Sequence, residues 1–258
     1  GIRRLPLVVF CYLGEWLRRC APRSIRRRVN CMPVFVNPMT IELRQVTENN
    51  FDEWRKAVRH GFGQHVHPDD IARLRNDRAE IDRLIAAVDT SSDRIVGTGG
   101  ADSYSLTLPG GSSVPMAGVA YMTTSVTHQR QGAFSRMMTQ IHDEARERGD
   151  LVSGLWASQS HLYSRFDYGL AVNSYDWEID PSFGDFSHSA VDSSDESDAH
   201  VYFVDADEAT AMLPGIYDQM HQQTIGSVNR NEGRWRYELF DEERVRGGAS
   251  ELFFAICE

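Results

Sequence analysis

Residues 126–138 read VTHQRQGAFSRMM and join two patterns of different periodicity. Before them, GVAYMTTSV at 118–126 is a run of apolar and β-branched residues, which is typical of a strand. After them, apolar residues recur at the spacing of one helix face, at Phe134, Met137, Met138, Ile141 and Ala145. Gly149 is suited to end this helix. The polar turn QRQG therefore predicts a strand that passes directly into a helix.

A strand, turn and helix of this kind form a candidate anion site. The first backbone N–H groups of a helix have no partner within the helix, and the helix dipole is positive at that end. Gly132 lets a ligand approach the backbone closely, and Arg130 adds a cation. A pyrophosphate would suit such a site. The residues alone are also consistent with an ordinary strand–helix connection that binds no ligand.

The residues before the turn predict a strand, two helices and an antiparallel meander. TIELRQV at 40–46 alternates apolar and polar residues as a strand does. A helix is expected next, with one apolar face formed by Phe51, Trp54, Val58 and Phe62. Pro68 and two acids suit the start of a second helix. Its expected apolar stripe comprises Ile71, Leu74, Ile81, Leu84 and Ile85. The period then changes, and 94–126 predicts three strands, with the tight turn PGG (109–111) between the second and third.

The residues after residue 150 predict further short elements. We expect a buried strand at 151–158, a short helix or turn at 160–169 and another strand at 171–180. The Ser- and Asp-rich residues 181–200 are typical of a linker. A second strand–helix unit is expected from residue 201, and LFFAIC at 252–257 predicts a final strand.

Composition and charge exclude several classes of protein. The chain has 258 residues, 41% of them hydrophobic, which is enough for one large or two smaller domains. Its formal charge of -10 disfavours nucleic acid as a partner, and no run of about 18 apolar residues predicts a membrane span. Lys56 is the one lysine and lies in WRKAV, which excludes a phosphate-binding P-loop. The pattern Gly97-x-Gly99-x-x-Asp102 is superficially similar to a dinucleotide-binding fingerprint. It lacks the third Gly and no helix follows it, so it does not indicate a dinucleotide site.

Residues 1–38 differ from the rest of the chain. They carry eight Arg and one acid, a net charge of +7, so the remaining residues carry -17. Three interpretations stay open: a short signal sequence, a basic interfacial helix, or upstream sequence translated in frame ahead of a start at Met32 or Met39. We expect this leader to be non-native or disordered.

Cysteine usage points to a reducing compartment. Of the four Cys, none lies between 32 and 256 and none forms a CxxC pair. We therefore expect neither a disulfide framework nor a metal site, and a cytoplasmic location.

The order of elements resembles the GNAT acetyltransferase fold, an α/β (α+β) fold with a mixed, mostly antiparallel sheet and flanking helices. That family's acetyl-CoA signature is R/Q-x-x-G-x-G/A. Gln129 and Gly132 match it, whereas Phe134 replaces the last Gly or Ala. Residues 117–138, together with ASQSHLYSRFDYGLAV at 157–172, are similar to the enhanced intracellular survival (Eis) acetyltransferases. Those proteins have a THRRRG-type turn followed by two bulky residues, and an IYGRFGYG segment downstream.

The resemblance implies a division into domains. Residues 39–180 would form a GNAT acetyl-CoA-binding domain, 181–200 a linker, and 201–258 part of a second GNAT-like domain. It also implies that the sterol-carrier-like third domain of that family lies outside this chain, and that the full-length protein forms a homo-oligomer.

The resemblance implies acetyl transfer from acetyl-CoA to a primary amine of a cationic acceptor, such as an aminoglycoside or a lysine. Tyr163 would be the general acid, with Arg165 and Tyr168 as structural supports. The residues expected to bind the cofactor are Tyr121, Met122, Thr123, Thr124, Gln129, Arg130, Gln131, Gly132, Ala133 and Phe134. Gln129 and Gln131 stand where the family has Arg, and Asp167 replaces a Gly.

Two other functions remain open from the sequence. The resemblance implies that the general base is the protein's own C-terminal carboxylate, delivered by the third domain. Because that domain is expected to lie outside this chain, the protein could be a catalytically silent acetyl-CoA-binding or assembly module. Alternatively, residues 1–31 could hold it at a membrane.

Overall fold

The computed structural model describes residues 41–77, 80–157, 159–171 and 200–258. The predicted leader, the strand expected at 171–180 and the linker lie outside these residues, apart from residues 171 and 200. None of the described helices combines the length and apolar character needed to span a bilayer.

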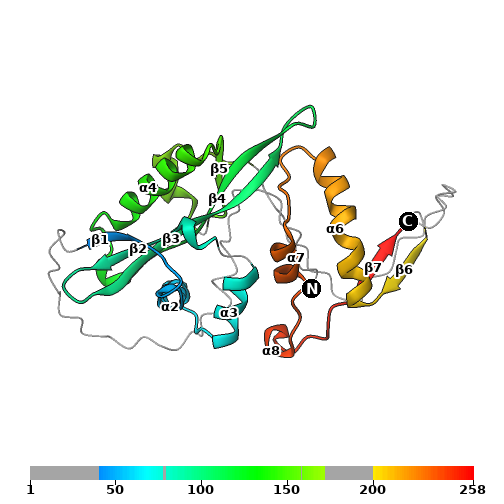
Figure 1. Ribbon diagram of the computed structural model, residues 1–258, viewed down its shortest axis with the longest axis horizontal. Helices are drawn as coiled ribbons and strands as arrows, with labels where there is room; N and C mark the ends of the chain where they lie inside the picture. The colour runs from blue at the N-terminus through cyan, green and yellow to red at the C-terminus, as the bar shows by residue number, and fades with distance from the viewer. Residues whose placement is uncertain (1–40, 78–79, 158, 172–199) are drawn as a thin grey trace.

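One five-stranded sheet organises the first part of the chain (Figure 1). Its order follows the sequence: β1 (Ile41–Gln45), β2 (Leu84–Asp89), β3 (Arg94–Thr107), β4 (Ser113–Thr124) and β5 (Val152–Leu155). The first four strands are antiparallel, and β5 pairs with β4 in parallel. The predicted mixed, mostly antiparallel sheet with flanking helices is confirmed.

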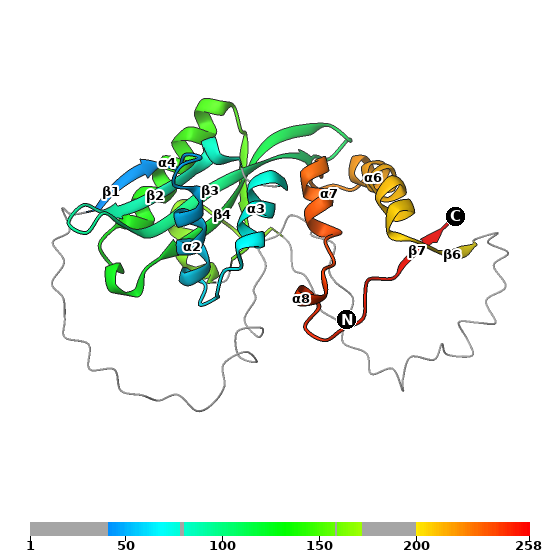
Figure 2. The same cartoon turned by 60° about the horizontal axis from the view of Figure 1, so that its bottom comes forward.

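Helices cover both faces of this sheet. α4 (Ala133–Arg148) packs on one face through Met137, Met138 and Ile141. α2 (Phe51–Gly61) and α3 (Pro68–Asp77) pack on the other, where Trp54 is fully buried. Figure 2 shows α2 and α3 together on the side of the sheet away from α4. The sheet is thus the middle layer of three, and α4 follows directly from the turn after β4 as predicted.

The sequence-based prediction of the second helix was wrong beyond residue 77. Ile81 lies in a short 3₁₀ helix (Ile81–Arg83), and Leu84 and Ile85 begin β2. Alternate residues of β2 join the two apolar layers, with Ile85 on the α4 side and Leu84 on the α2 side. A strand buried on both faces is a continuous apolar run, which periodicity does not distinguish from a buried helix.

The meander has two strands where three were predicted. The first two expected strands are one continuous strand, β3. A Cβ atom at Gly100 would lie 2.6 Å from Leu84 Cδ2 and 2.8 Å from Arg83 O. Glycine here therefore permits close approach to β2 rather than a turn. The predicted turn at 109–111 is confirmed, since Leu108 N donates to Ser112 O at 2.7 Å.

Residues 200–258 form β6 (Val201–Val204), α6 (Ala206–Gln223), α7 (Glu232–Glu238), α8 (Glu243–Arg246) and β7 (Phe254–Cys257). β6 and β7 pair in a separate antiparallel ribbon. Residues between α6 and α7 meet the end of β3, where Thr107 N donates to Ser227 O at 3.0 Å. Arg236 on α7 pairs with Asp77 at the end of α3 at 2.7 Å. The predicted domain boundaries stay a prediction.

Candidate functional site

A β-bulge interrupts β4 where it pairs with β3. Gly100 pairs with Ala120 and Thr98 pairs with Thr123, so Tyr121 and Met122 face Gly99 alone. Tyr121 has a left-handed φ of 62°, and its carbonyl oxygen accepts a hydrogen bond from Thr98 Oγ1 at 2.7 Å. A bulge leaves a residue unpaired in the ladder, so it frees backbone groups of β4 for a ligand.

The turn after β4 ends in an open helix N-terminus. Arg130 and Gly132 both have left-handed backbone, with φ of 61° and 82°. Gly132 is the N-cap of α4, and no side chain caps this end. A Cβ at Gly132 would have no atom within 4 Å, so the space in front of it is open. The exposed N–H groups and the helix dipole therefore suit an anion.

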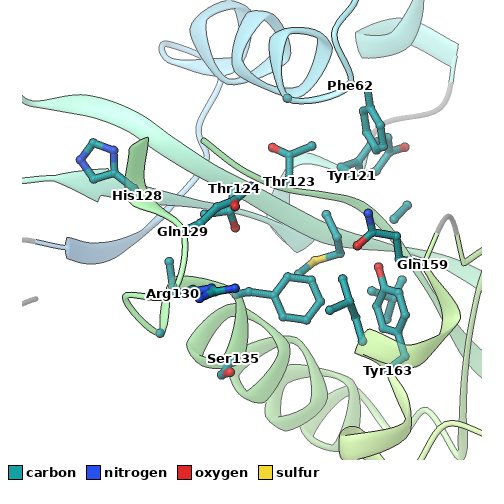
Figure 3. Close-up of a pocket in the computed structure, with 18 of the residues that line it drawn as sticks. Phe62, Tyr121, Thr123, Thr124, His128, Gln129, Arg130, Ser135, Gln159 and Tyr163 are labelled. Carbon is teal, nitrogen blue, oxygen red and sulfur yellow. The ribbon is translucent and has the colours of Figure 1, made fainter. Parts of the chain in front are cut away.

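A cavity of about 900 Å³ joins the bulge to this turn. β4 and β5 pair only from Met116–Val152 to Val119–Leu155, and β4 continues to Thr124 without β5. The cavity opens where this pairing ends. Its lining combines β4 backbone, the turn, the end of α2 and the chain after β5 (Figure 3).

Tyr163 lies at the other end of this cavity from the turn. It sits between two short 3₁₀ helices, η4 (Ser160–Leu162) and η5 (Ser164–Phe166). Its side chain is buried, and its ring contacts that of Phe134 edge-on at 5.7 Å. In Figure 3 its hydroxyl points into the cavity, toward Gln159. Burial raises the pKa of Tyr163, which keeps the phenol protonated.

Tyr168 holds the segment that carries Tyr163. Its hydroxyl lies 2.5 Å from Ser153 Oγ on β5 and 2.9 Å from His142 Nε2 on α4. Burial raises the pKa of Tyr168 to about 12 and lowers that of His142. The Tyr168 ring lies edge-on to Tyr163 at 6.0 Å. These contacts fit the structural support predicted for Tyr168.

The residues expected to bind the cofactor gather at this cavity with one exception. Tyr121, Met122, Thr123, Thr124, Gln129, Arg130, Gly132, Ala133 and Phe134 line it, as does Tyr163. Gln131 does not line it, and the buried Oε1 of Gln131 has no hydrogen-bond partner among the described residues. Arg165, expected as a support, also lines the cavity, with its guanidinium 5.5 Å from the Phe134 ring centre.

Nine lining residues were not singled out for the site from the sequence, and four of them have large polar or aromatic side chains: Phe62, His128, Trp156 and Gln159. Phe62 was expected on the buried face of its helix, but it is 46% exposed. His128 lies within the THRRRG-type turn, and Trp156 and Gln159 lie just before the segment of Tyr163. Their proximity to those motifs is the signal that could have found them. Among the residues that the structure describes, no group of three His, Cys, Asp or Glu is placed to hold a metal ion.

Comparison with known proteins gives concordant results. The model of the family described as an acetyltransferase (GNAT) domain matches residues 42–171. An uncharacterized N-acetyltransferase of Streptomyces avermitilis is 30% identical over 220 residues, which cover 85% of this chain and 52% of that protein. The N-acetyltransferase Eis of Mycobacterium tuberculosis is 25% identical over 217 residues, covering 83% and 54%.

A solved structure shares the fold. The crystal structure of Eis1 from Mycobacterium abscessus superposes with a TM-score of 0.62 at 22% identity, over 83% of this chain and 51% of that chain. This chain spans about half the length of the curated relatives that it matches.

Proposed function

Because this chain belongs to the GNAT acetyltransferase family and resembles the Eis N-acetyltransferases, we propose that it moves an acetyl group from acetyl-CoA to a primary amine. The observation that carries the proposal is the continuous cavity between an uncapped helix N-terminus and a buried tyrosine. One end suits the anionic part of the donor, and the other suits proton transfer at its thioester.

The turn would bind the pyrophosphate of acetyl-CoA. Backbone N–H groups at the start of α4 would donate to it, and Arg130 would add a positive charge. Gln129 and Gln131 are neutral, so most of the binding would come from backbone donors. At the bulge, the freed backbone of β4 would polarise the thioester carbonyl.

Tyr163 would protonate the departing thiolate. The unperturbed pKa values of a phenol and a thiol are roughly 10 and 8.5, so proton transfer between them costs little. Burial raises the pKa of Tyr163. It also raises that of a thiol in the same cavity, because low dielectric disfavours either anion. The two groups therefore remain matched inside the cavity.

We propose a cationic acceptor of the aminoglycoside or lysine type. The chain carries -10 in total and residues 1–38 carry +7, which leaves -17 on the remainder to attract cations. Phe62 and Trp156 line the cavity and are 46% and 40% exposed. Aromatic faces attract ammonium groups.

The predicted division into two units also belongs to this proposal. β6 and β7 pair with each other and not with the five-stranded sheet, which supports a second unit that begins near residue 201.

Calorimetric titration with acetyl-CoA tests the donor site. Gly132→Glu would place a carboxylate in the open space before α4, whereas Gly110→Glu introduces the same side chain at an equally open, left-handed glycine of the hairpin. Loss of one charge-assisted hydrogen bond is worth about 1.5–3 kcal/mol. We therefore expect Gly132→Glu to weaken binding by roughly 10- to 150-fold. Gly110→Glu should bind as the unaltered chain does.

Release of thiol in the presence of an aminoglycoside, spermidine or a lysine peptide then tests turnover. A folded chain that fails to bind acetyl-CoA contradicts the proposal. Binding without acetylation of any of these amines would favour the catalytically silent module instead.

A further inference from the structure

A side-chain amide faces the cavity beside Tyr163. Gln159 follows β5 and immediately precedes η4, where its backbone carbonyl accepts a hydrogen bond from Leu162 N at 3.1 Å. Its side chain is exposed and makes no hydrogen bond with another residue that the structure describes. In Figure 3 this amide lies in the cavity, and the Tyr163 hydroxyl points toward it. The donor and the acceptor of the amide are therefore both available to a ligand.

The hydroxyl groups of β4 near this point already have partners. Thr98 Oγ1 donates to the Tyr121 carbonyl at 2.7 Å and lies 2.6 Å from Thr123 Oγ1. Because a hydroxyl carries one proton, the proton between the two threonines comes from Thr123. The Tyr121 hydroxyl donates to Asp102 Oδ1 at 2.9 Å. These side chains are thus committed to holding the bulge, whereas Gln159 is not committed to any contact of the fold.

The segment that presents Gln159 is anchored on both sides. Ala157 is 1% exposed and belongs to the core cluster under α4. Tyr163 is buried in the same cluster, so the residues between them span a short distance with both ends fixed. A group that contacts a reacting atom has to be held in place before the reaction. The anchoring of this segment meets that requirement for Gln159.

A position next to Tyr163 is also next to the attacking nitrogen. Under the proposed function, the Tyr163 hydroxyl reaches the sulfur of acetyl-CoA. During acetyl transfer this sulfur and the amine nitrogen are bonded to one carbon, so a group beside the hydroxyl lies near both. In the view of Figure 3, Gln159 lies between Phe62 and Tyr163, across the cavity from Arg130. Gln159 is therefore on the side that the anionic part of the donor leaves open.

An amide oxygen suits an attacking amine. The lone pair of the amine forms the C–N bond, so its N–H groups need acceptors. The nitrogen gains positive charge as the bond forms, and a hydrogen bond to an oxygen dipole becomes stronger in the transition state. A neutral amide also avoids the full negative charge that would hold the amine in its protonated, unreactive form.

We propose that Gln159 binds the acceptor amine, with Oε1 accepting an N–H bond that directs the lone pair toward the thioester carbonyl. This inference rests on the proposed function and deepens it by naming a residue that contacts the acceptor. Gln159 gains and loses no proton. The bonds that form and break in acetyl transfer, and the group that removes the proton of the amine, are therefore independent of this contact.

A carboxylate at position 159 would change the charge of the cavity. Its described lining residues include the cationic Arg130 and Arg165 and the titratable His128, but no Asp or Glu. Arg165 lies against the Phe134 ring, with its guanidinium 5.5 Å from the ring centre. Gln159→Glu keeps the length of the side chain and places a negative charge next to the proposed position of the amine.

The first test removes the amide. Calorimetry measures spermidine binding to the 258-residue chain saturated with coenzyme A, and thiol release gives kcat/KM for spermidine. Loss of one hydrogen bond to a charged group corresponds to about 10-fold or more in affinity. We expect Gln159→Leu to lower spermidine affinity and kcat/KM roughly 10-fold, with acetyl-CoA affinity unchanged. Gln223→Leu is the control, because Gln223 is an exposed residue at the end of α6, outside the cavity lining.

The second test uses Gln159→Glu from pH 7 to 9.5. An alkyl ammonium such as that of lysine has an ordinary pKa of about 10.4, so alkaline solutions contain free amine that needs no general base. A carboxylate at 159 stabilises the ammonium. We expect a lower KM, a lower kcat at pH 7, and a rise of kcat with pH that is displaced to higher pH. A residue that only supports the loop would not displace this profile.

The outcomes separate the two proposals. A folded chain that acetylates no amine at any pH overturns the proposed function and this inference with it. An active chain in which Gln159→Leu keeps its spermidine affinity and kcat/KM, or loses acetyl-CoA affinity instead, overturns the contact and leaves the acetyltransferase proposal intact. Circular dichroism melting identifies a variant that fails to fold. Should Gln159→Leu fail to fold, the pH profile of Gln159→Glu decides.

Discussion

Tyr168→Phe should destabilise the protein because it removes a hydroxyl that makes two hydrogen bonds. The substitution keeps the ring but leaves Ser153 Oγ and His142 Nε2 without the partner that they have at 2.5 and 2.9 Å. Each unsatisfied, partly buried group costs about 1–3 kcal/mol. Both groups have some access to water, so we expect a total loss of about 2–3 kcal/mol in the free energy of unfolding. That corresponds to a fall in Tm of roughly 5–10 °C for a chain of this size.

Tyr168 should also make the free energy of unfolding fall at alkaline pH. The folded pKa of Tyr168 is raised to about 12. The unfolded value is about 10. The folded state therefore keeps a proton that the unfolded state loses, and its stabilising effect is complete below pH 10 and disappears as pH rises toward 12. Tyr168→Phe should remove this part of the alkaline loss.

Urea unfolding followed by circular dichroism, from pH 7 to 11.5, measures both effects. Tyr202→Phe is the matched control, because its exposed hydroxyl bonds Glu258 at 3.0 Å, and we expect a change within about 0.5 kcal/mol. A Tyr168→Phe variant as stable as the unaltered chain at pH 7 would refute the assignment of a supporting role to Tyr168.

Three further outcomes are expected. Tyr163→Phe should lower kcat by about 10²- to 10⁴-fold without changing the affinity for acetyl-CoA. Steady-state kinetics measures kcat and calorimetry measures the affinity, and equal losses in kcat and in affinity would contradict a role in proton transfer. Asp150→Asn should cost about 3–5 kcal/mol in urea unfolding, because Arg83 and Asp150 form a buried ion pair at 2.6 Å; a cost below 1 kcal/mol would contradict this. Asp167→Gly should raise stability by up to about 1 kcal/mol, since Asp167 has a left-handed φ of 64°, and a lower Tm would speak against backbone strain there.

The sequence predicted those features of the site that are formed by residues adjacent in the chain. The strand, turn and helix around Gly132 are adjacent in sequence, so one glycine and one change of period suffice to predict them. The comparisons also confirmed the fold and the Eis-type resemblance that these motifs indicated.

The part that the sequence did not predict depends on contacts between distant residues. Asp102 meets Tyr121 only because the register of β3 and β4 shifts at a bulge. Phe62 fits a helical face by spacing, but α2 ends at Gly61, so Phe62 leaves the buried face. β2 was misread because both of its faces are buried. Register, helix termination and two-sided burial arise from tertiary packing rather than from local periodicity.

The early end of the pairing between β4 and β5 bears on how this site can change by mutation. On the side where the donor is proposed to bind, β4 and the following turn line the cavity, and their backbone N–H groups remain in every substitution except one to proline. Phe62, just after α2, and Trp156 and Gln159, just after β5, line the cavity from two other segments of the chain. Under the proposed function, substitutions in these two segments would change which acceptor is recognised, while the backbone groups proposed to bind acetyl-CoA would stay the same.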